Sequence, residues 1–198
     1  MKDQSLELIA KMFDDKVKIV LSKESGPFSD VKNKIIYLPE KVTFLEGKQR
    51  VELLVYLLHE IGHILYSKKF QNIHYENNYL NDYLNILEDI KIQIHINNFF
   101  YSSESIYKYI FTELYKDRKS DYSNISTILN HLIKHFLLMK TNISFYYDKD
   151  MYDYLISKDL ELENIIIRFN NSQNQENLTK ILYDLHKILL EYCLKYFK

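Results

Sequence analysis

Residues 48–67 read KQRVELLVYLLHEIGHILYS, and the architecture expected for this chain is built around them. Its apolar residues fall on almost every side of a helix, which is typical of a helix that is buried on most of its surface. Three ionisable residues, His59, Glu60 and His63, lie in the middle of the stretch. Because charged groups are costly to bury unless they are paired or bound to a metal, the stretch predicts a central helix that also carries a chemical site.

The site is the motif His59-Glu60-Ile61-Gly62-His63. Residues i and i+4 share one face of a helix, so both imidazoles can bind one metal ion. Glu60 is turned by about 100° from His59, so it can face an open coordination position and take a proton from metal-bound water. The composition gives about 0.02 such motifs by chance, which favours a metal site over coincidence.

A catalytic zinc site needs a third protein ligand, and residues 81–93 (NDYLNILEDIKIQ) offer two carboxylates among apolar neighbours. We expect Glu88 to be this ligand. Asp89, with Asn85 on the same helix face, is expected to hydrogen-bond a ligand histidine and orient it. Two other ligand assignments stay open, namely Asp89 itself and His95, two turns further along the helix. Both carboxylates could also be solvated charges on a helix surface.

The rest of the chain predicts an α+β fold that is mostly α, with a small N-terminal sheet before the central helix. Two segments rich in β-branched residues, 16–22 and 34–38, are predicted strands, and Pro39 ends the second. A polar loop is expected over 170–177. Apolar periodicity predicts further helices over 5–14, 76–98, 103–116, 124–140, 149–168 and 176–197.

Length and composition indicate one domain over residues 1–198, with a core at 1–98 and a helical subdomain at 99–198. The formal net charge of -1 makes a nucleic-acid partner a weak prediction. The single cysteine, Cys193, excludes an internal disulfide framework and fits a reducing compartment. We expect no signal peptide and no membrane partner, since no run approaches the roughly 18 apolar residues of a membrane span.

The HEIGH helix followed by a helical glutamate resembles the zincin metallopeptidases, and specifically their glutamate-zincin branch. The segment NILEDIKI is similar to the Asn-x-x-Glu-Asp pattern of metallopeptidases predicted in bacteria and phages. The resemblance implies a zincin-like active-site helix, with Zn²⁺ on His59, His63 and Glu88 and with Glu60 as general base. It also implies that NKIIYLP is an edge strand along which a peptide or protein substrate aligns.

We therefore expect zinc-dependent hydrolysis of peptide bonds in the cytoplasm of a bacterial or phage-infected cell. The alternative is a non-catalytic zincin-like binding, structural or regulatory protein, for instance a phage protein, whose zinc site is closed. A fourth ligand such as His95 would favour that alternative. The sequence carries no signal for the oligomeric state.

Four further residues have two interpretations each. Tyr79 and Tyr83 precede the carboxylates and could hydrogen-bond an oxyanion, or could be ordinary core residues. His131 and His135 form a second i, i+4 pair, which could bind a metal but is more typical of surface histidines. His186 is expected on the solvated side of the last helix.

Gly62 is the most informative glycine. A glycine inside a helix costs about 1 kcal/mol relative to alanine, so its position within the motif predicts that another element approaches closely there.

Overall fold

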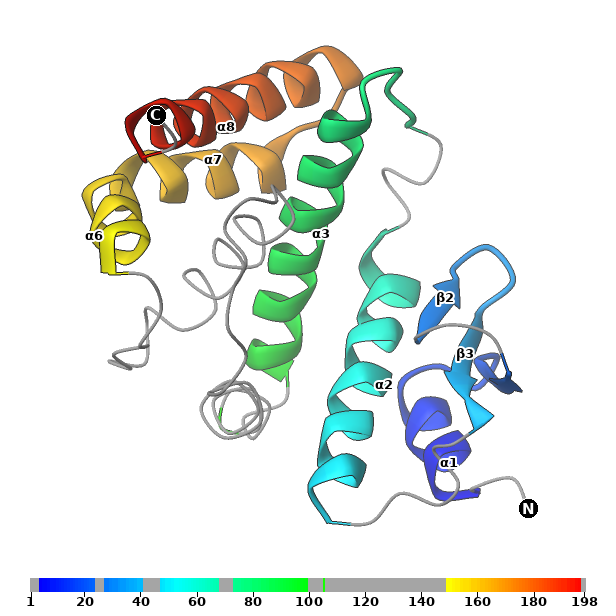
Figure 1. Ribbon diagram of the computed structural model, residues 1–198. Helices are drawn as coiled ribbons and strands as arrows, with labels where there is room; N and C mark the ends of the chain where they lie inside the picture. Colours follow the sequence, from blue (N-terminus) through cyan, green and yellow to red (C-terminus); the bar gives the residue numbers. More distant parts are fainter. Residues whose placement is uncertain are drawn as a thin grey trace. The chain divides into compact units, whose positions relative to one another are not determined.

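The computed structural model describes residues 4–23, 27–40, 47–67, 73–99, 105 and 149–196 (Figure 1). Helices predominate over a small N-terminal sheet, so the predicted mostly α, α+β fold class is confirmed. The helices predicted over 103–116 and 124–140, with the pair His131 and His135, lie outside the described residues. The elements are α1 (Gln4–Phe13), β1 (Lys18–Ser22), β2 (Phe28–Asp30), β3 (Ile35–Pro39), α2 (Lys48–Tyr66), α3 (Asn78–Phe99), α6 (Lys149–Ser157), α7 (Asp159–Asn171) and α8 (Gln175–Tyr196).

The chain forms two compact units. Unit 1 comprises Met1–Gln71 and Ile92–Leu114, and unit 2 comprises Asn72–Lys91 and Tyr115–Lys198. The boundary falls inside the continuous helix α3, whose first part counts with unit 2 and whose last part counts with unit 1.

The sheet of unit 1 has the strand order β1-β3-β2. Strand β3 pairs in parallel with β1 and antiparallel with β2, so it is the central strand. The expectation that NKIIYLP is an edge strand open to a substrate is therefore wrong. The second side of β3 is occupied by β2, and this strand of three residues (Phe28–Asp30) is too short to give a sequence signal.

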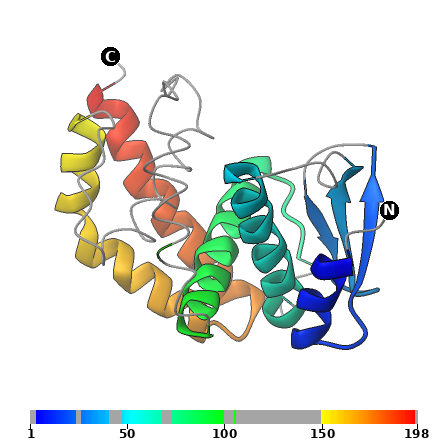
Figure 2. The same cartoon turned by 90° about the horizontal axis from the view of Figure 1, so that it is seen from below.

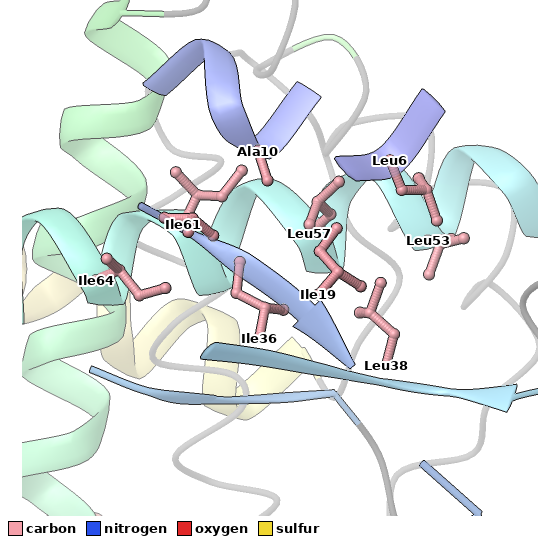
Figure 3. Close-up of a cluster of buried hydrophobic side chains, with 10 residues drawn as sticks. Leu6, Ala10, Ile19, Ile36, Leu38, Leu53, Leu57, Ile61 and Ile64 are labelled. Atoms are coloured by element: carbon pink, nitrogen blue, oxygen red, sulfur yellow. The ribbon is translucent and has the colours of Figure 1, made fainter. Parts of the chain in front are cut away.

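One face of this sheet is covered by α1 and α2 (Figure 3). Alternate residues of a strand point to one face, and Ile36 and Leu38 of β3 accordingly reach the core while their neighbours do not. This packing fixes α2 against the sheet along most of its length. The buried cluster consists of Leu6, Ala10, Val17, Ile19, Ile36, Leu38, Leu53, Leu57, Ile61 and Ile64.

Unit 2 contains the C-terminal helices, of which α7 and α8 lie side by side (Figures 1 and 2). The single helix predicted over 149–168 is wrong, because the chain leaves helical geometry at Lys158 and begins a new helix at Asp159. The predicted loop over 170–177 is also shorter than expected. Helix α7 runs to Asn171 and α8 starts at Gln175, so polar residues form helix ends there.

Among the described residues, no helix is long and apolar enough to cross a membrane.

Candidate metal centre

Helix α2 brings the two motif histidines together as their spacing predicts. The Nε2 atoms of His59 and His63 lie 3.1 Å apart, and the ring planes meet at 80°. Both rings are half-buried, and Glu60 between them is 7% exposed. The sheet core explains this placement, because Leu57, Ile61 and Ile64 on the opposite side of the helix are buried against the strands.

The separation of the two nitrogens fits a shared metal ion. Two nitrogens bound to zinc at about 2.0–2.1 Å with tetrahedral geometry lie about 3.3 Å apart. The observed 3.1 Å between the Nε2 atoms of His59 and His63 is close to that value. The rings are thus already arranged as a pair of ligands.

A third side chain, Asp89 of α3, completes a group with metal-binding chemistry. One ligand atom from each of His59, His63 and Asp89 lies within 4.8 Å of the other two. Two imidazole nitrogens and one carboxylate oxygen are a donor set that zinc takes in catalytic sites. Of the described residues, this is the one such group of three or more.

Glu88, the predicted ligand, does not belong to that group. Its Oε1 atom is buried, but the grouped carboxylate is that of the next residue. Neighbouring residues on a helix point about 100° apart, and the carboxylate that lies with the two histidines is that of Asp89. Of the predicted ligand alternatives, Asp89 is the one whose carboxylate lies with both histidines. Asn85, predicted to act beside Asp89, is exposed.

His95, the other alternative ligand, stacks on Tyr66 near the end of α2. The ring centroids are 4.6 Å apart and the planes meet at 18°. The group formed by His59, His63 and Asp89 does not include His95.

Gly62 lies in close contact with side chains of α3, and the sequence predicts such an approach. A Cβ atom at Gly62 would lie 2.3 Å from Cγ2 of Ile92 and 2.8 Å from Cδ1 of Ile96. Both isoleucines are buried and pack with Leu58 of α2. Because Asp89 lies one turn before Ile92 on the same continuous helix, the absent side chain at position 62 helps to bring its carboxylate to the motif.

Sequence reasoning missed Ser67. Its Oγ lies 2.9 Å from Nδ1 of His63, on the ring nitrogen that does not face His59. Ser67 is 3% exposed and ends α2. Its spacing could have identified it, since a residue four positions after His63 lies on the same helix face.

Tyr79 and Tyr83 meet His186 of α8 within unit 2. The Tyr83 hydroxyl lies 3.0 Å from Nδ1 of His186, and the Tyr79 ring stacks on that histidine at 4.7 Å. His186, expected on the solvated side of the last helix, is half-buried against these two tyrosines. Burial raises the pKa of Tyr83 to about 12. These contacts favour the interpretation of both tyrosines as packing residues.

Compared with known proteins, the chain matches no protein-family model, no curated protein and no solved structure. The assignment of the site therefore depends on its own sequence and geometry.

Proposed function

We propose that this chain is a zinc-dependent peptidase whose metal is held by His59, His63 and Asp89. The observation that carries the proposal is the 3.1 Å separation of the two Nε2 atoms with the Asp89 carboxylate beside them. The set has three protein ligands, which leaves a fourth position for water or substrate.

Bound zinc would polarise a carbonyl group and lower the pKa of its water toward about 7. The chain's own residues would contribute general acid–base catalysis, through Glu60. Its carboxylate would take a proton from the attacking water and pass it to the leaving amine. Burial of Glu60 within the motif helix supports this role, because a water-poor site strengthens the interactions that stabilise charge.

The choice of an amide substrate rests on the resemblance of the motif to the zincin metallopeptidases. A peptide that adds to the sheet would pair with β1 or β2, because β3 already has a neighbour on each side. The single cysteine supports a reducing compartment such as a bacterial cytoplasm.

The first test is the metal content of the purified protein beside a matched pair of variants, Asp89→Ala and Glu88→Ala. We expect one zinc per chain in the wild type and in Glu88→Ala, and loss of zinc in Asp89→Ala. Loss of zinc in Glu88→Ala but not in Asp89→Ala would instead identify Glu88 as the ligand. A wild type that stays metal-free after incubation with zinc would overturn the proposed site.

The second test separates zinc binding from catalysis with Glu60→Gln. Removing a general base costs about 10²–10⁴-fold in rate, while zinc content should be unchanged. Cleavage is followed by mass spectrometry on a library of peptides from digested protein, with and without a chelator. Equal cleavage by Glu60→Gln and wild type would refute the mechanism. Bound zinc without any cleavage would leave a zinc-binding protein that is not a peptidase.

A further inference from the structure

Ser67 is attached to His63 at two points. Its backbone N–H donates to the His63 carbonyl oxygen, and its Oγ lies 2.9 Å from Nδ1 of the His63 ring. The residue is 3% exposed, so bulk water competes little for that ring nitrogen. The end of α2 therefore holds a hydroxyl against the edge of the imidazole.

This contact matters because a neutral imidazole carries a single ring proton. One nitrogen donates a hydrogen bond and the other offers a lone pair, and the partner of the first nitrogen selects the tautomer. His63 can bind a metal through Nε2 only when its proton is on Nδ1. With that proton on Nδ1, Ser67 Oγ accepts the hydrogen bond and the Nε2 lone pair faces His59.

We propose that Ser67 is a positioning residue that holds His63 in its Nδ1–H tautomer, with the ring oriented for metal binding before the metal arrives. The inference rests on the proposed metal site and assigns a residue that the motif does not contain. In many metal sites this partner of the ligand histidine comes from a carboxylate or a backbone carbonyl. Here it comes from the same helix, one turn later, so the orientation of His63 needs no second element.

The tautomer can be measured without zinc and without a substrate. In metal-free protein labelled with ¹⁵N, long-range nitrogen–hydrogen correlation spectra distinguish the two ring forms at a pH where His63 is neutral. We expect the Nδ1–H form of His63 in the wild type and a mixture in Ser67→Ala. The exposed His74 is the internal reference and should be the same in both proteins. An Nε2–H form in the wild type would overturn the proposal.

Zinc affinity gives the second readout, with Ser67→Thr and Ser67→Val as a matched pair. Both side chains are branched and similar in shape, but only threonine keeps the hydroxyl. Loss of such a partner typically weakens metal binding 10–100-fold, so we expect Ser67→Val to bind zinc at least about 10-fold more weakly than Ser67→Thr.

Circular dichroism and urea unfolding of all variants identify any that fail to fold. Equal zinc affinity in the two folded variants would overturn the role of Ser67 while leaving the proposed function intact. A wild type that binds no zinc would instead overturn the proposed function. The tautomer spectra would still show whether Ser67 holds His63 in its Nδ1–H form.

Discussion

Two histidines, one in each unit, make the same local contact in different surroundings. Nδ1 of His63 lies 2.9 Å from the Ser67 hydroxyl, and Nδ1 of His186 lies 3.0 Å from the Tyr83 hydroxyl. The other nitrogen of His63 faces His59 at 3.1 Å, with Asp89 in the same group. His186 lies against the aromatic rings of Tyr79 and Tyr83 and, among the described residues, joins no such group.

The difference shows what makes a histidine a candidate ligand. A hydrogen bond at one ring nitrogen only orients the imidazole, which helps helix packing as much as metal binding. A metal site needs several lone pairs that converge on one point. That convergence is present around His63, whereas the partners of His186 are aromatic rings and a hydroxyl.

Variants of the two histidines themselves are expected to differ most in zinc binding. His63→Ala removes a proposed ligand and should abolish zinc binding, whereas His186→Ala should bind zinc like the wild type. Isothermal titration of the metal-free proteins with zinc measures both. Equal loss of zinc binding in the two variants would show that the metal does not distinguish the two histidines.

The next effect concerns the contact between α2 and the last part of α3. Gly62→Leu places atoms where Ile92 and Ile96 already lie, and such overpacking costs about 3 kcal/mol of unfolding free energy. Zinc affinity should fall with it, because Asp89 is on the displaced helix. Urea unfolding and zinc titration are the measurements.

The double variant Gly62→Ala/Ile92→Ala serves as the control for Gly62. Shortening Ile92 makes room for the new methyl group, so the cost of the pair should be smaller than the sum of the two single variants. If the costs of the two single variants simply add in the double variant, contact with Ile92 does not explain the glycine at position 62.

A smaller effect is expected from alkaline pH in unit 2. The pKa of Tyr83 is about 12 in the folded chain, against an ordinary value of 10.0 for tyrosine, so the unfolded chain loses this proton first. Stability is intact below pH 10 and falls as pH rises toward 12, by about 2 kcal/mol for this group. Urea unfolding at pH 8, 10 and 11 measures the decline.

Tyr83→Phe is expected to have the smallest effect, and it tests whether the contact at His186 is independent of zinc binding at His63. It should cost about 1 kcal/mol near neutral pH through loss of the hydrogen bond to His186. It should also make the alkaline decline less steep than in the wild type, by about as much as Tyr154→Phe does, because the pKa of that buried tyrosine is raised to about 12 as well. Zinc affinity should stay at the wild-type value, and a loss of affinity would contradict the separation of the two histidine sites.

The elements with strong periodicity could be predicted from the sequence. Helix α2 was expected over 48–67 and runs from Lys48 to Tyr66, and α8 was expected over 176–197 and runs from Gln175 to Tyr196. The break at Lys158 could not be predicted, since that segment contains no glycine or proline. Lys158 forms ion pairs with Glu161 and with Glu191 of α8, a contact 33 residues away that only the folded chain creates.

The local sequence pattern was enough to predict the face of α2 that carries His59 and His63. The spacing of His59 and His63 is set by the helical repeat, a local property of the backbone, and Gly62 indicated the close approach of another element. The remaining features arise only in the folded chain. Folding brings the carboxylate of Asp89, not that of Glu88, into one group with the two histidines, places β3 in the centre of the sheet and pairs His186 with Tyr83. Each of these depends on how one element is rotated or paired against another, and packing between distant segments sets that.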